Sequence, residues 1–94
     1  TQEIIFNSTD AIAASNYILV YPNPNKGVFT LDWSETSLNV ESIKIINTLG
    51  QTLQKLTIDS NNPIQLDLND KSSGVYFVEI AFDKGLIVKK VVKE

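Results

Sequence analysis

The feature of the sequence that most constrains the fold is the recurrence of apolar residues at every second position in short runs. Four stretches show this period: "VFTLDW" at 28–33, "SIKIIN" at 42–47, "IQLDL" at 64–68 and "VYFVEIAF" at 75–82. Successive side chains of a β-strand point to opposite faces, so this period predicts strands with one buried face. The residues predicted to face the core are Phe29, Leu31, Trp33, Ile43, Ile45, Ile64, Leu66, Leu68, Tyr76, Val78, Ile80 and Phe82.

Turn-forming residues separate these runs at short intervals, and no long stretch has the period of a helix. The turns are expected at 22–27, 49–50, 61–63, 72–74 and 83–85. In "TLQKLTI", Leu53 and Leu56 have opposite parity, which predicts a β-bulge or an early strand end. Six or seven short strands with frequent turns favour an all-β fold, an antiparallel β-sandwich, with a small open barrel as the alternative.

The 94 residues suffice for a single domain. Residues 1–16 are mostly small and polar apart from Ile4–Phe6, and we interpret them as a linker from an upstream domain, with room for one short strand. Residues 17–94 are predicted to form the domain itself. The chain contains no methionine, so we expect it to be a piece of a larger protein.

The composition argues against several classes of function. The net charge is −3 and arginine is absent, whereas a nucleic-acid-binding domain needs a concentrated basic face. Without histidine or cysteine the chain lacks the usual general base and thiol nucleophile. No apolar run approaches the ~18 residues that span a bilayer. We therefore predict no enzyme activity, cofactor, small-molecule substrate, nucleic-acid partner or membrane-spanning segment.

A cluster of oxygen-bearing side chains, Asp67, Asn69 and Asp70, admits a calcium site, because hard cations bind several oxygen ligands. The cluster lacks the glycine and the distal glutamate of a known calcium loop. A strand end that runs into a polar turn is the interpretation we favour.

Tyr17, Tyr21, Trp33 and Tyr76 could form a sugar-stacking face. However, Trp33 shares its parity with Phe29 and Leu31, and Tyr76 shares its parity with Val78 and Ile80. We therefore predict that Trp33 and Tyr76 belong to the core.

Two segments stand out near the ends of the predicted domain. In "YPNPNKG", Pro22 and Pro24 fix φ and lack a backbone N–H, so the segment predicts a corner at which regular pairing stops. In "GLIVKKVVKE", apolar and basic residues mix without clean alternation. Lysines on a last strand can protect an edge from unwanted pairing, or the strand can be left open to a partner. The residues alone favour edge protection.

The order of these features along the chain resembles a known family. "YPNPNKG" precedes a strand, and "IKIINTLGQTL" supplies a strand, a Gly turn and a strand. "IQLDLNDKSSGVYFVEI" supplies an alternating strand, a polar turn and a Gly-x-Tyr strand before the final lysine-bearing strand. From Tyr17 to Glu94 the chain is similar to the type A C-terminal sorting domain of proteins exported by the type IX (Por) secretion system of Bacteroidetes-type bacteria.

The resemblance implies an Ig-like antiparallel β-sandwich of about seven short strands that is not an enzyme. It also implies passage through the periplasm, recognition by the outer-membrane type IX translocon, and removal by a cell-surface sortase-type peptidase, so that the cargo is secreted or stays at the cell surface. Proteases need an accessible backbone, so we expect any cleavage in residues 1–16. The alternative is an Ig-like carbohydrate-binding or adhesion module of a secreted multidomain protein.

The family's motifs fall on particular residues of this chain. The structural motif residues are Pro22, Asn23, Pro24, Gly27 and Gly50. The residues implied in recognition by the translocon or sortase are Gly74, Tyr76, Lys89, Lys90 and Lys93. One departure is "DKSSG" at 70–74, where many relatives carry a more apolar turn. With the resemblance in view, partner binding becomes the favoured interpretation of the final strand.

Overall fold

The computed structural model describes residues 17–36, 39–59, 62–83 and 85–94. The predicted linker 1–16, with Ile4–Phe6, lies outside the described residues, as does Lys84 of the turn at 83–85.

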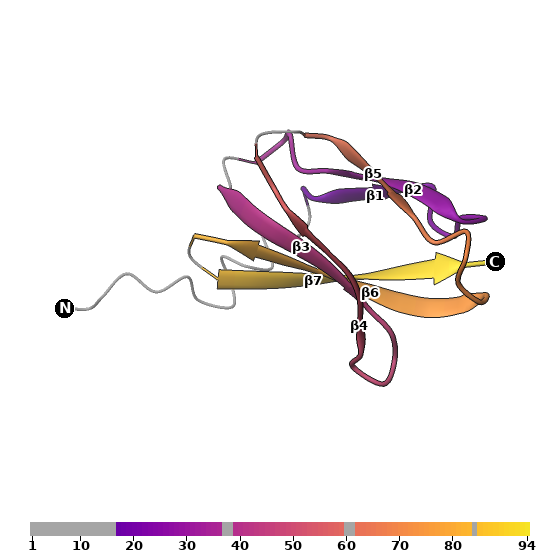
Figure 1. Ribbon diagram of the computed structural model, residues 1–94. Coiled ribbons are helices and arrows are strands. Elements are labelled where there is room, and N and C mark those ends of the chain that lie inside the picture. Colours follow the sequence, from indigo (N-terminus) through magenta and orange to yellow (C-terminus); the bar gives the residue numbers. More distant parts are fainter. Residues whose placement is uncertain (1–16, 37–38, 60–61, 84) are drawn as a thin grey trace.

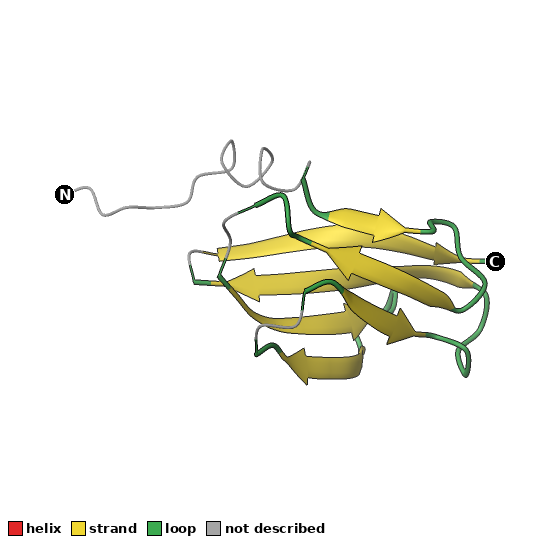
Figure 2. Ribbon diagram, turned by 90° about the horizontal axis from the view of Figure 1, so that it is seen from above, coloured by secondary structure: helices red, strands yellow, loops and turns green. Residues whose placement is uncertain are grey.

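The described chain forms seven strands in two antiparallel sheets (Figure 1). The strands are β1 (Leu19–Tyr21), β2 (Val28–Asp32), β3 (Val40–Ile46), β4 (Thr52–Thr57), β5 (Ile64–Asp67), β6 (Gly74–Phe82) and β7 (Gly85–Lys93). One sheet has the order β1-β2-β5 and the other the order β4-β3-β6-β7. Figure 2 shows the same strands from above, without a helix among them. In this part of the chain no helix is long and apolar enough to cross a membrane.

Two separate sheets, packed face to face, confirm the predicted sandwich over the open barrel. The order differs in one strand from that of a constant-type Ig domain, in which the fourth strand lies in the sheet of the first two. Here β4 pairs with β3, so the sheet that contains the last two strands has four members and the other has three.

The core consists of the inward-facing side chains of both sheets, as the two-residue period predicted. The three-stranded layer contributes Ile18, Phe29, Leu31, Trp33, Leu66 and Leu68, and the four-stranded layer contributes Val40, Ile43, Ile45, Tyr76, Val78, Ile80, Phe82, Ile87 and Val91. Ile64 is partly buried and packs against this cluster.

The predicted irregularity in β4 is a bulge. Ile45 pairs with Gln54 and Ile46 with Thr52, so Leu53 is the extra residue. The bulge lets Leu53 and Leu56, which have opposite parity, both pack against the core.

The aromatic side chains divide between core and surface. Trp33 is 5% exposed and Tyr76 is 7% exposed, which confirms their predicted place in the core. Tyr17 and Tyr21 are exposed. A sugar-stacking face that includes all four rings is therefore not formed.

The burial of Trp33 predicts a large loss of stability for Trp33→Ala. Truncating a large aromatic core side chain removes its transfer free energy and leaves a cavity, so the free energy of unfolding should fall by about 3–5 kcal/mol. Tyr17→Ala, at an exposed ring, should change it by no more than about 0.5 kcal/mol. Denaturant unfolding of both variants is the measurement, and equal losses would contradict the assignment of Trp33 to the core.

Candidate functional site

The proline corner transfers the chain from one sheet to the other. Up to Tyr21 the chain pairs with β2, but Asn25 forms an isolated parallel bridge with Lys93 of β7. Asn25 N donates to Val92 O at 2.9 Å, and Glu94 N donates to Asn25 O at 2.7 Å. Pro22 and Pro24 cannot donate to a ladder, so β1 ends before the switch. We call Pro22–Gly27 together with Lys90–Glu94 the seam.

Asn23, between the two prolines, uses its side chain as a second peptide group. Its Nδ2 donates to Lys90 O at 3.0 Å, and Val92 N donates to its Oδ1 at 3.0 Å. An asparagine amide has the donor and acceptor of a peptide unit, so it can satisfy the edge of β7 where the proline backbone cannot. The corner thereby covers the edge of β7 from Lys90 onward.

The inner part of the seam is tightly packed. Asn25 is 1% exposed, and its Oδ1 accepts a hydrogen bond from Gly27 N at 2.9 Å. Gly27 has φ +138°, and a Cβ built on it would overlap Oδ1 of Asn69 in the turn after β5. Gly27 O in turn accepts from Leu68 N at 2.5 Å. This position therefore needs a glycine both for its φ and for its close neighbour.

Lys93 fixes the turn between β5 and β6. Its ammonium group donates to the backbone oxygens of Leu68, Asn69 and Lys71, at 2.9, 3.3 and 2.5 Å. An ammonium group has three N–H donors, so these contacts engage all of them. Lys93 is thus a structural residue of the seam, and its direct recognition by a partner stays a prediction.

The Gly-x-Tyr motif begins β6 beside the end of β7. Gly74 pairs with Lys93 and has φ +149°, and Tyr76 pairs with Val91. The ring of Tyr76 is buried, and its hydroxyl donates a hydrogen bond to Ser72 O at 2.5 Å. This bond also holds the turn between β5 and β6. The corner, the turn after β5 and the C-terminal strand therefore meet at one end of the sandwich, the right-hand end in Figure 1.

The remaining predicted residues lie differently. Gly50 closes the β3–β4 hairpin, where its N–H donates to Asn47 O at 3.0 Å and its φ is +84°. Lys90 is exposed and shares its parity with the exposed Leu86 and Val88. Lys89 shares the parity of the buried Ile87 and Val91, so the side chains of the two adjacent lysines leave the strand on opposite faces of the sheet. Alternation along β7 could have shown this.

Sequence reasoning did not identify the roles of Asn23 and Asn25 as hydrogen-bonding groups. The available signal was an asparagine between two prolines, because a side-chain amide is the natural substitute for missing backbone donors. Its partner on β7 is 67 residues away in the sequence, which no local pattern reveals.

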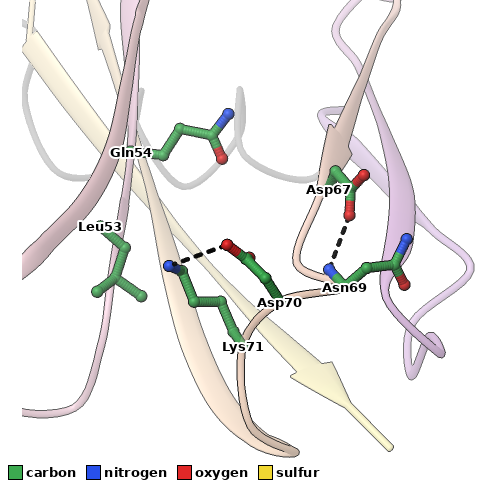
Figure 3. Close-up of a pocket in the computed structure, with 6 residues that line it drawn as sticks. All are labelled: Leu53, Gln54, Asp67, Asn69, Asp70 and Lys71. Atoms are coloured by element: carbon green, nitrogen blue, oxygen red, sulfur yellow. Dashed lines mark hydrogen bonds and ion pairs between the residues drawn. The ribbon is translucent and has the colours of Figure 1, made fainter.

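The polar cluster after β5 lines a pocket of about 370 Å³ (Figure 3). Its walls are Leu53, Gln54, Asp67, Asn69, Asp70 and Lys71. Asp67 Oδ1 accepts from Asn69 N at 2.7 Å, and Lys71 Nζ lies 3.6 Å from Asp70 Oδ2. Both are contacts of a polar turn, the favoured interpretation of this segment. The described residues contain no group of three or more His, Cys, Asp or Glu placed to hold a metal ion.

A second polar group joins Tyr21 of β1 to the end of β2. The hydroxyl and backbone N–H of Ser34 both donate to Asp32 Oδ1, and these bonds lower the pKa of the Asp32 carboxyl. The hydroxyl of Tyr21 lies 3.4 Å from Asp32 Oδ2. Desolvation, and then the Asp32 charge, raise the pKa of Tyr21. At neutral pH the group therefore holds an ionised Asp32 beside a protonated Tyr21.

Comparison with known proteins gives one finding. The model of the family described as "Secretion system C-terminal sorting domain" matches residues 19–94. No curated protein matches the chain.

The contacts of Lys93 predict a difference between two lysines of β7. Lys93→Met keeps most of the aliphatic stem but removes three hydrogen bonds to backbone oxygens, so the free energy of unfolding should fall by about 1–2 kcal/mol. Lys90→Met, at an exposed position, should change it by at most about 0.5 kcal/mol. Urea unfolding curves measure both, and equal effects would contradict the structural role of Lys93.

Gly27 and Gly74 both have positive φ, but their surroundings predict that substitution by alanine lowers stability to different degrees. Gly74→Ala meets open space and suffers backbone strain alone, whereas Gly27→Ala also meets Asn69. Strain of this kind costs about 1–3 kcal/mol, so Gly27→Ala should be the more destabilising variant in thermal unfolding. Adding Asn69→Ala should restore part of the loss in Gly27→Ala. If it restores none, the overlap with Asn69 does not explain the glycine.

Proposed function

Because the chain belongs to the family of type IX secretion system C-terminal sorting domains, we propose that the seam end of the folded sandwich is the surface by which the translocon recognises it. The family role is that of a sorting signal, which implies export to the cell surface or secretion. A sorting-signal family is not an enzyme family. The observation that supports our proposal is the convergence of the Pro-x-Pro, Gly-x-Tyr and lysine-bearing segments at one end of the fold.

The seam is a surface that only a folded chain presents. It joins residues 22–27 to residues 90–94, and Lys93 adds the turn at 68–71. An unfolded or partly folded chain does not bring these segments together. A receptor that binds the seam would therefore select chains whose sorting domain has already folded.

The predicted recognition residues have different roles in this proposal. Lys90 is exposed, and its ammonium group would contact the translocon directly, as would the exposed corner residues Pro22 and Asn23. Gly74, Tyr76 and Lys93 would act by holding the shape of the surface, because each is committed to a turn or a strand pair. Lys89 would contribute positive charge beside them.

Release of the domain would follow export. A sortase-type peptidase at the cell surface would cut within residues 1–16, ahead of the first strand, and leave the sandwich intact. The cargo upstream would then be secreted or retained at the surface.

The proposal is tested by fusing residues 1–94 to a reporter in a host with the type IX apparatus. The reporter should reach the cell surface or the medium, and Lys90→Glu should lower export about tenfold, as a loss of about 1.4 kcal/mol in binding would do. Lys55→Glu, an exposed lysine in β4, is the matched control and should export normally. The unfolding temperature of each purified domain shows that the fold is unchanged.

Two outcomes would oppose this proposal. If the unmodified fusion stays in the periplasm, the chain does not act as a sorting signal. If Lys90→Glu and Lys55→Glu export equally, the seam end is not the recognised surface.

A further inference from the structure

The outer edge of β7 is covered along only half its length. Lys90 O, Val92 N, Val92 O and Glu94 N all point away from β6, since they bond to the corner. Backbone groups alternate in direction along a strand, so the N–H and C=O of Leu86 and Val88 point the same way. Among the described residues, nothing pairs with these four groups.

The reason for the open half is the sheet switch at Pro22. Before the corner the chain pairs with β2 in the other layer, and only after it does the chain reach β7. Figure 1 shows β1 in the upper layer and β7 in the lower one. A strand added beside Leu86 and Val88 would therefore stop where the side chain of Asn23 begins.

The open half also lacks the usual protection of an edge. Leu86 is 52% exposed and Val88 is 48% exposed, although edges that must stay unpaired usually carry charges or proline. Of the seven exposed large hydrophobic side chains in the described chain, five lie in β1 and β7 or just before β1. Unpaired backbone groups beside exposed apolar side chains are the features to which an extended peptide binds by strand addition.

The charge at the end of the open half limits what can bind. Lys90 lies next along the same face, and the nearest acid in register, Glu79 opposite Val88, is paired with Lys44 at 3.6 Å. A strand that places a lysine beside Lys90 is disfavoured, because like charges on paired strands are destabilising. A strand with a carboxylate opposite Lys90 is favoured instead.

We propose that the open half of β7 binds an extended, acid-bearing β-strand of a partner protein. The strand would pair with the backbone of Leu86 and Val88, place apolar side chains beside theirs, and hold a carboxylate near Lys90. The identification of the partner as a component of the secretion apparatus rests on the proposed function. The strand pairing itself does not.

The first test uses hydrogen exchange on the 94-residue chain. Alone, the amides of Leu86 and Val88 should exchange quickly at every protein concentration. The probe is a nine-residue peptide of alternating valine and threonine with one central glutamate, and its control carries lysine in place of the glutamate. The glutamate peptide should slow exchange at both amides and bind at least about tenfold more tightly than the lysine peptide.

Val88→Pro tests the backbone contact directly. The N–H of Val88 faces outward, so proline removes a donor for the partner but none from the β6 ladder, and edge positions of this kind tolerate proline. The variant should stay folded but no longer bind the glutamate peptide. The matched control Val88→Thr should stay folded and bind the peptide as the unmodified chain does. Lys90→Glu, which leaves the backbone unchanged, should reverse the preference in favour of the lysine peptide.

Several outcomes would overturn the proposal. Slow exchange of both amides at all dilutions would show that another segment of the same chain pairs with this edge. Slow exchange only at high protein concentration would show that a second copy of the chain pairs with it. Equal binding of the two peptides, or binding that survives Val88→Pro, would exclude the acid-bearing strand.

The export assay separates this proposal from the proposed function. Normal export of the Val88→Pro fusion would exclude strand pairing in recognition while the sorting role stands. Failure of the unmodified fusion to leave the periplasm would remove the sorting role, whereas the peptide results would still decide whether the edge binds an acidic strand.

Discussion

The hydrogen bonds between the corner and the last strand are the interactions on which the arrangement of the site depends. Asn23 contacts residues that lie 67 and 69 positions later in the sequence, and Asn25 adds two backbone bonds beside it. Closing so long a loop has an entropic cost, which grows only slowly with the length of the loop. Contacts that form together must offset this cost. The packed core holds the two layers in position, and the seam then links their edges. Gly27 and Lys93 then join the corner and the end of β7 to the turn after β5.

The sandwich could be predicted from the sequence because its cause is local. Alternation decides which side chains face inward, and it identified residues such as Phe29, Ile45 and Val78 correctly. The parity conflict of Leu53 and Leu56 identified the bulge for the same reason. The site was less predictable because its contacts are long-range. The proline corner and the terminal lysines were treated as separate features at opposite ends of the chain, whereas they are neighbours. The hydrogen bonds of Lys93 to three carbonyl groups have no sequence signature at all.

The seam also shows that the lysines of one strand can have different surroundings. Lys93 and Lys90 lie three positions apart in β7, yet one is held by backbone oxygens and the other is exposed to solvent. The side chain of Lys89 leaves the strand on the face opposite that of Lys90. A group of basic residues at the end of a domain is therefore not one functional unit. Each lysine has to be assigned from its own surroundings.

The parallel bridge between Asn25 and Lys93 has a consequence for protein synthesis. A ribosome makes residues 22–27 long before residues 90–94, so the corner must wait for its partner until the whole of β7 has been translated. A polypeptide interrupted before Lys90 would carry the proline corner but could not complete the seam. The surface at this end of the sandwich therefore exists only in chains that contain the whole of β7.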